Sequence, residues 1–241
     1  MLYVMEKGHI HPISQIIRDM VRIFGDMGFS YREGPECESE YYNFDALNVP
    51  KDHPSRDMQD TFFIKDKPGF VLRTHTSPVQ IRSMEKYGAP LRIIAPGKVF
   101  RNEATDATHE AQFYQLEGLM VDKGVSMAHL KGTLQRFFEE FFKGSVEIRF
   151  RPSFFPFVEP GVEVDMRVMS ADAPEKLRGR WIEIMGAGMV HPNVLRAGKI
   201  NPEEYSGFAF GMGIDRLAML YFGVDDIRHF YSGDLRFVNQ F

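Results

Sequence analysis

Residues 100–122 read FRNEATDATHEAQFYQLEGLMVD, and this stretch decides how the rest of the chain is interpreted. The pattern predicts a β-hairpin with strands over residues 91–103 and 111–121. Arg101 and Glu103 are two residues apart on the first predicted strand, so both side chains leave the same face of the sheet. The hairpin therefore begins with a guanidinium and a carboxylate side by side.

The second predicted strand carries Phe113, Gln115 and Glu117, again two apart and on one face. Polar residues on one face of an antiparallel sheet ordinarily face only solvent, which is the alternative interpretation. A guanidinium, however, binds phosphate through paired hydrogen bonds, an aromatic ring stacks on a flat base, and an amide with a carboxylate can hold an ammonium group. This mixture favours a binding face for a nucleotide and an amino acid.

A second stretch, GFAFGMGIDRLAMLYFG at residues 207–223, predicts a strand, a turn between glycines and a helix that ends at Gly223. Arg216 falls in the first turns of that helix, where the helix dipole disfavours a cation by about 0.3–1 kcal/mol. Either an ion pair with Asp215 or another acid compensates, or Arg216 reaches a phosphate or stacks on a base opposite Phe113.

A third stretch, RPSFFPFVEPGVE at residues 151–163, places Phe155 and Phe157 on either side of a proline. We expect both rings on one side of an extended segment. Such pairs are usually core residues, but they can also hold an aromatic ligand in edge-to-face contact.

The remaining periodicity predicts a single α+β domain over residues 1–241, built around an antiparallel sheet. Ser77, Pro78 and Gln80 match a capping box that starts a helix. We expect further helices over 12–27 and 126–142, and further strands over 146–151, 162–168, 181–186 and 205–211. Residues 34–60 predict a long ordered loop, and residues 169–180 an exposed loop or hairpin between two strands.

Composition narrows the class of protein. The formal net charge of −4 gives no sign of the basic face with which proteins grip nucleic acid. The single cysteine, Cys37, excludes an intrachain disulfide and suits a reducing compartment. No apolar run reaches the roughly 20 residues of a membrane span, and the N-terminus is unlike a signal peptide, so we expect a soluble cytoplasmic protein.

The hairpin around Arg101 resembles motif 2 of the class II aminoacyl-tRNA synthetases, and GFAFGMGIDR resembles motif 3. Six strings, in order along the chain, are similar to the phenylalanyl-tRNA synthetase alpha chain: YNFDALN, LRTHTSPVQ, DATHEAQFYQLEG, FFPFVEP, GAGMVHPNVL and FAFGMGIDRLAML. The resemblance implies an antiparallel sheet flanked by helices. It also implies that phenylalanine and ATP, with Mg²⁺, form phenylalanyl-adenylate, the first step of phenylalanyl-tRNA synthesis.

The resemblance further implies roles for individual residues. Arg101 and Arg216 are the implied catalytic residues, and the implied ATP-binding set is Arg101, Glu103, His109, Phe113 and Arg216. The implied phenylalanine-binding set is His75, Ser77, Gln115, Glu117, Phe155, Phe157, Val158, Ala209 and Gly211, with Ala209 as the floor of the pocket. His75 has a purely structural role as its alternative, and Glu183 is the candidate Mg²⁺ ligand because an acid near a polyphosphate is expected to coordinate the ion.

The family works with a beta chain that carries its editing domain, and its alpha chain usually begins with a helical arm that contacts tRNA. This chain starts almost at the first predicted helix, so we expect weak or indirect binding of tRNA(Phe) and doubtful tRNA charging by this chain alone. Without a beta chain, an exposed apolar surface could be covered in a homodimer. The alternative function is a non-catalytic paralogue that binds an amino acid or a partner chain as a sensor.

Overall fold

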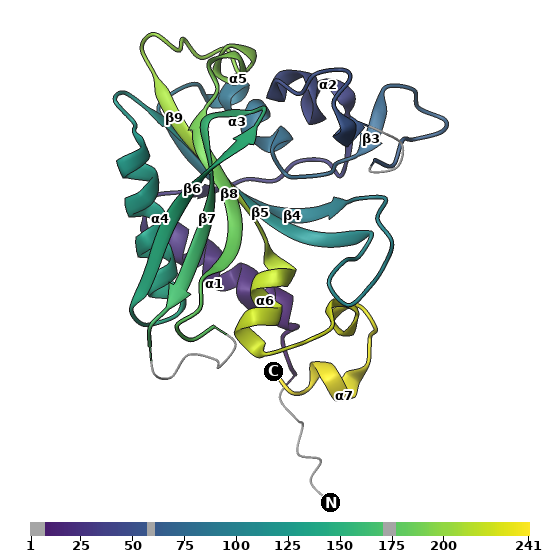
Figure 1. Cartoon of the computed structure of the whole chain (residues 1–241). Coiled ribbons are helices and arrows are strands. Elements are labelled where there is room, and N and C mark those ends of the chain that lie inside the picture. Colours follow the sequence, from purple (N-terminus) through teal and green to yellow (C-terminus); the bar gives the residue numbers. More distant parts are fainter. Residues whose placement is uncertain (1–7, 57–60, 171–176) are drawn as a thin grey trace, which may run out of the picture.

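A seven-stranded sheet forms the centre of the computed structural model, which describes residues 8–56, 61–170 and 177–241 (Figure 1). Its strand order is β1-β4-β5-β9-β8-β7-β6. Every neighbouring pair is antiparallel except β1, which runs parallel to β4. The predicted α+β class is therefore confirmed, with a parallel edge strand in addition. The strands are β1 (Ser30–Tyr31), β4 (Leu91–Phe100), β5 (Gln112–Asp122), β6 (Val146–Phe155), β7 (Val158–Val168), β8 (Ile182–Val190) and β9 (Ser206–Gly213).

Three amphipathic helices supply the apolar core on one face of this sheet. They are α1 (Pro12–Asp26), α4 (Met127–Phe141) and α6 (Ile214–Phe222). The rings of Phe24 on α1 and Phe137 on α4 are stacked, with centroids 4.6 Å apart. Pro12 stands at the start of α1, where its missing N–H costs nothing, and His11 caps that helix by accepting from the backbone N–H of Ile13 at 3.2 Å. The predicted helices over 12–27 and 126–142 are confirmed.

A second apolar cluster lies against the other face and is built from shorter elements. The elements that contribute to it or flank it are α3 (Pro78–Tyr87), α5 (Pro192–Ala197), α2 (Glu40–Asn43), the 3-10 helices Asp45–Leu47 and Pro54–Arg56, and the two-stranded sheet of β2 (Cys37–Ser39) with β3 (Phe70–Leu72). The prediction that residues 34–60 form a loop is wrong over about half of residues 34–56, and residues 57–60 lie outside the described residues. Ser39 caps α2, and Phe44 and Leu47 are buried, so apolar burial rather than periodicity fixes this segment.

The hairpin of β4 and β5 is shorter than predicted on its first strand. Strand β4 ends at Phe100, so Arg101 and Glu103 lie just beyond it rather than on it. The backbone N–H of Arg101 still donates to the carbonyl of Ala111 at 3.0 Å. Beyond that bond, Asp106 accepts from the backbone of Thr108 at 2.6 Å and folds the loop on itself. Local turn bonds therefore replace the ladder.

The segment 169–180 joins β7 to β8, as predicted, although residues 171–176 lie outside the described residues. The prediction of exposure is wrong at Leu177, which is fully buried. Arg178 pairs with Val168 in an isolated bridge, which holds Leu177 against the core. The chain closes with the 3-10 helix η3 (Ile227–Phe230) and α7 (Leu235–Val238). Within the described ranges, no helix has the length and apolar character to cross a bilayer.

Candidate active site

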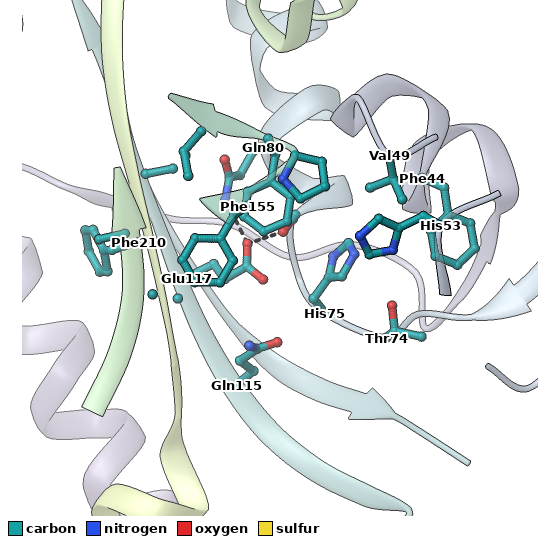
Figure 2. A pocket seen from close by; sticks show the side chains of 18 of the residues that line it. Phe44, Val49, His53, Thr74, His75, Gln80, Gln115, Glu117, Phe155 and Phe210 are labelled. Carbon is teal, nitrogen blue, oxygen red and sulfur yellow. Dashed lines mark hydrogen bonds between the residues drawn. The ribbon is translucent and has the colours of Figure 1, made fainter. Parts of the chain in front are cut away.

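A cavity of about 410 Å³ opens between the segments that carry α2 and α3 and the face of the sheet that bears the second apolar cluster. It receives side chains from β5, β9, the β6–β7 turn and the residues before α3 (Figure 2). Most of the residues predicted to form the site line it: His75, Ser77, Arg101, Glu103, Gln115, Glu117, Phe155, Phe157, Val158, Ala209 and Gly211. The structure thus brings together residues that are more than a hundred positions apart in the sequence, such as His75 and Gly211.

Glu117 is a buried carboxylate in this cavity. It accepts hydrogen bonds from the Ser77 hydroxyl, from Nε2 of Gln80 at 2.8 Å and from the backbone N–H of Thr76 at 3.2 Å. Burial raises the pKa of Glu117 to about 7, although the three donors act in the opposite direction. The site therefore holds a carboxyl group that changes its charge near neutral pH.

The predicted capping box at Ser77 and Gln80 is wrong in its chemistry. Helix α3 does begin at Pro78, but Ser77 makes no capping hydrogen bond. Both side chains donate to Glu117 instead. Burying the Glu117 carboxylate without hydrogen-bond donors would cost several kcal/mol. The side chains of Ser77 and Gln80 therefore bind this carboxylate and not the N-terminus of α3.

Two polar atoms in the cavity are buried without a hydrogen-bond partner in the described part of the chain. They are Nδ1 of His75 and Oε1 of Gln115. Burial, followed by the charge of Arg101, lowers the pKa of His75 to about 3, so the ring is neutral at physiological pH. Buried polar atoms in native proteins are nearly always paired, so this pair is available to a polar ligand.

The opposite end of the cavity is apolar. The rings of Phe155 and Phe157 stack with centroids 5.9 Å apart and planes inclined by 20°. The expected extended segment is wrong, because Phe157 lies in the tight turn between β6 and β7; the expected proximity of the two rings is confirmed. Gly186 makes room for this arrangement, since a Cβ there would lie only 2.9 Å from the Phe155 ring. The result is an aromatic wall over a floor of small residues.

Arg101 connects the cavity to the hairpin of β4 and β5. Its Nε donates to the carbonyl of Thr74 at 3.2 Å, and Nη1 lies 4.0 Å from Oε1 of Glu103. The guanidinium also lies over the ring of Phe113, 5.1 Å from its centroid. Phe113 does not line the cavity itself, but it stands directly beside the arginine that does.

The other predicted residues lie outside the cavity. Arg216 is exposed in the first turn of α6 and forms no ion pair or hydrogen bond within the ranges that the structure describes. The alternative of an ion pair with Asp215 is wrong, because that carboxylate is buried and accepts from the backbone N–H of Tyr114 and the hydroxyl of Tyr231. His109 is exposed in the hairpin loop, with Nδ1 at 3.0 Å from Asp106.

Glu183 also lies outside the cavity and pairs with Nη2 of Arg151 at 2.9 Å. No group of three or more His, Cys, Asp or Glu side chains that could hold a metal ion occurs among the described residues. Mg²⁺ commonly takes only one or two protein carboxylates and completes its shell with water and substrate phosphates. A single acid such as Glu183 is therefore compatible with Mg²⁺ only together with a phosphate ligand.

Several residues of the site were missed from the sequence. Gln80 carried a signal, but its spacing was interpreted as a helix cap. Others come from segments without periodicity or are small residues: Phe44, Val49, His53, Thr74, Gly186 and Ala187. Pro156 and Phe210 also line the cavity and were not predicted. Phe154, which is 81% exposed at the mouth of the cavity, was also missed.

A buried carboxylate facing an aromatic wall, with an arginine hairpin beside it, matches the arrangement that the motifs implied. The family model of the class II core domain of tRNA synthetases (F) matches residues 3–241. The chain belongs to this class II synthetase family. The class II domain is 56% identical to a phenylalanine–tRNA ligase alpha subunit of Halalkalibacterium halodurans over 240 residues, which are 98% of this chain and 69% of that protein.

Similar identities hold for other relatives of this class II domain. The alpha subunit of Clostridium kluyveri phenylalanine–tRNA ligase is 54% identical, and that of Bacillus subtilis is 53% identical. Each match covers 97% of this chain and 69% of the relative. The resemblance inferred from the six strings is therefore confirmed over nearly the whole class II domain.

Proposed function

We propose that this chain activates phenylalanine with ATP, forming phenylalanyl-adenylate and pyrophosphate as the first step of phenylalanyl-tRNA synthesis. One observation carries the proposal: the buried carboxylate of Glu117 and the aromatic wall of Phe155 and Phe157 line the same cavity. An α-amino acid with an aromatic side chain has the matching ends, an ammonium group and a phenyl ring. Relatives that share more than half of the sequence are named phenylalanine–tRNA ligases, which supports the same substrate.

In the proposed complex the ammonium group of phenylalanine binds Glu117 and Gln115. His75 and Ser77 help to position the polar end of the amino acid, and the unpartnered Nδ1 of His75 supports this role. Phe155, Phe157 and Val158 face the phenyl ring, while Ala209 and Gly211 form the floor. A Cβ at Gly211 would lie 3.0 Å from the Glu117 side chain, so glycine there leaves room beside the carboxylate.

For ATP, we propose that Arg101 holds the α-phosphate and that Phe113 and Arg216 stack on opposite sides of the adenine. Glu103 and His109 contact the nucleotide from the hairpin. Arg216 is exposed at the positive end of α6 and has no partner among the described residues. A cation in this position favours a polyanionic ligand such as ATP, which supports a place for Arg216 in the nucleotide site. Mg²⁺, held by Glu183 and the phosphates, would neutralise charge on the polyphosphate, and Arg151 would then have to release Glu183.

The reaction needs no nucleophile from the protein. A carboxylate oxygen of phenylalanine forms a bond to the α-phosphorus of ATP while the bond from that phosphorus to the pyrophosphate oxygen breaks. The domain contributes alignment of the two substrates and stabilisation of the charge that develops on the phosphoryl oxygens. Arg101 is the residue placed to provide that stabilisation.

We further propose that residues 1–241 act as one catalytic domain in the cytoplasm and pair with a beta chain. The relatives are named alpha subunits, which supports a partner of that kind. We also propose that most of the tRNA-binding charge lies outside this chain, and the formal net charge of −4 supports this. A homodimer is the arrangement we propose when no beta chain is present.

Phenylalanine-dependent exchange of pyrophosphate into ATP tests the proposal, with tyrosine as the comparison amino acid. We expect exchange by the chain alone or by the chain reconstituted with a beta subunit. Folded protein that shows no exchange in either form would contradict it. The sensor alternative is not favoured by the identity to ligases, and binding of phenylalanine without binding of ATP would revive it.

A further inference from the structure

Strand β5 continues past the point where its neighbour stops. The last residue pair between them is Gln115 with Gly213, after which the chain leaves β9 and enters α6. The backbone N–H of Tyr114, the next residue along β5, would have no strand to donate to. The carboxylate of Asp215 takes this place and accepts that N–H at 2.6 Å.

Asp215 is also held by a third segment. The hydroxyl of Tyr231, which follows η3, donates to its other oxygen. The same segment reaches the hairpin loop, since the backbone N–H of Ile227 donates to the carbonyl of Ala107 at 2.9 Å. Asp215 is only 1% exposed, and burial raises the pKa of its carboxyl to about 6 although both donors act in the opposite direction. A buried carboxylate that lost either hydrogen bond would carry an uncompensated desolvation cost. The two hydrogen bonds therefore hold the Asp215 side chain in one position.

The neighbours of these two bonded residues are the ones that the proposed function assigns to the nucleotide. Tyr114 follows Phe113 directly, and Asp215 directly precedes Arg216. Phe113 and Arg216 belong to different elements, β5 and α6. To stack on both faces of the adenine, their side chains must be separated by a gap that is the thickness of one base. Between them, the Asp215 carboxylate bonds directly from the start of α6 to the backbone of β5.

We propose that Asp215 is a positioning residue that sets the separation of Phe113 and Arg216, and through it the affinity of the site for a purine nucleotide. The inference rests on the proposed function, because it takes the nucleotide to bind between those two side chains. It adds a residue that touches neither substrate. It also gives the segment around Tyr231 a part in ATP binding.

The test compares Asp215→Ala, Asp215→Asn and Tyr231→Phe with the wild-type chain, using calorimetry with ATP and, separately, with phenylalanine. We expect Asp215→Ala to weaken ATP binding by about tenfold or more and to leave phenylalanine binding within about twofold. Asp215→Asn keeps an oxygen that can accept from Tyr114, so we expect it to recover most of the affinity for ATP. Tyr231→Phe removes one bond and should lie between Asp215→Ala and the wild type.

Asp226→Asn is the matched control, because Asp226 caps η3 in the same segment and accepts from the backbone of Arg228 at 3.0 Å. We expect it to leave both affinities unchanged. Equal losses for ATP and phenylalanine in Asp215→Ala, or unchanged ATP binding, would overturn the inference. If Asp215→Ala does not fold, unchanged ATP binding in Tyr231→Phe overturns it instead. A wild-type chain that binds phenylalanine but no ATP refutes the proposed function, and the inference with it.

Discussion

The hydroxyl of Ser77 donates to the carboxylate of Glu117 across the gap between the start of α3 and strand β5. Gln80 adds a second bond from the first turn of the same helix, at 2.8 Å. The carboxylate is therefore oriented before any substrate arrives. Preorganisation of this kind reduces the cost of ordering a site when an ammonium group binds.

The first prediction concerns pH and Glu117. Because burial raises its pKa to about 7, the carboxyl is largely protonated at pH 6 and ionised at pH 8. Phenylalanine should therefore bind more tightly at pH 8 than at pH 6, by about tenfold or less. Calorimetry across this range measures the effect. His75, whose pKa is lowered to about 3, does not titrate here.

Glu117→Gln serves as the comparison for that pH profile. It keeps the size of the side chain but removes the charge, so we expect weak binding of phenylalanine with little dependence on pH between 6 and 8. The same profile in the variant and the wild type would show that another group is responsible.

The second prediction concerns Arg101. Arg101→Ala should lower kcat for pyrophosphate exchange by about 10²–10³, the range for loss of one group that stabilises transition-state charge, and should change KM for phenylalanine much less. Steady-state exchange kinetics measure both constants. Arg22→Ala is a suitable control, because Arg22 is an exposed residue of α1 that pairs with Asp26 at 3.7 Å. A loss confined to KM would contradict the proposed role.

The third prediction concerns the aromatic wall. Gly186→Ala places a Cβ 2.9 Å from the Phe155 ring, so we expect a loss of about 1–3 kcal/mol in the free energy of unfolding and a higher KM for phenylalanine. Gly132→Ala is the matched control, since nothing lies within 4 Å of its added Cβ in α4. That change should stabilise the protein by about 0.5–1 kcal/mol. Denaturant unfolding measures the free energy of unfolding of both variants. A similar change in the two variants would refute the steric explanation.

The fourth prediction concerns the depth of the pocket. Ala209 lies opposite Gly188 on the neighbouring strand and lines the cavity. Ala209→Val adds two methyl groups and should reduce kcat/KM for phenylalanine by about 10–200-fold. Ala209→Gly should instead raise exchange with para-chlorophenylalanine relative to phenylalanine. Ala209 does not limit the depth of the pocket if kcat/KM for phenylalanine is unchanged in Ala209→Val and the exchange with para-chlorophenylalanine relative to phenylalanine is unchanged in Ala209→Gly.

The fifth prediction concerns Mg²⁺. Glu183→Gln should raise the Mg²⁺ concentration needed for half-maximal exchange by about tenfold or more, because even loss of a residue that only hydrogen-bonds to a metal ligand costs about 10–100-fold in metal affinity. Glu147→Gln is the control, because Glu147 also pairs with an arginine on this sheet, Arg167. Equal Mg²⁺ requirements in the two variants would remove Glu183 from the metal site.

Elements with strong periodicity could be predicted from the sequence. The stripe over residues 12–27 corresponds to α1 at Pro12–Asp26, and the stripe over 126–142 to α4 at Met127–Phe141. Alternation along the hairpin also placed Gln115 and Glu117 correctly on one face, because side chains of a strand alternate strictly. These features depend only on neighbours in the sequence.

Features that depend on distant partners could not be predicted in this way. The same Ser77 and Gln80 could cap a helix or bind a carboxylate, and only the position of Glu117 on β5, forty residues after Ser77 in the chain, decides between the two. The fold of residues 34–56 depends on burial of Phe44 against α3 and its neighbours, and the sequence of this segment has no periodicity that would reveal it. The bond from Tyr114 to Asp215 spans a hundred residues and has no local signature.

The small residues at the centre of the sheet have a consequence for the life of the protein. Gly186 faces Gly211, and Gly188 faces Ala209, so the strands offer backbone where a core would normally have side chains. On the proposed function, the phenyl ring of bound phenylalanine packs against these strands and completes the apolar core only while the substrate is bound. A ligand at 100 times its Kd adds about 2.7 kcal/mol to stability, so resistance of this chain to unfolding and proteolysis should follow the supply of phenylalanine.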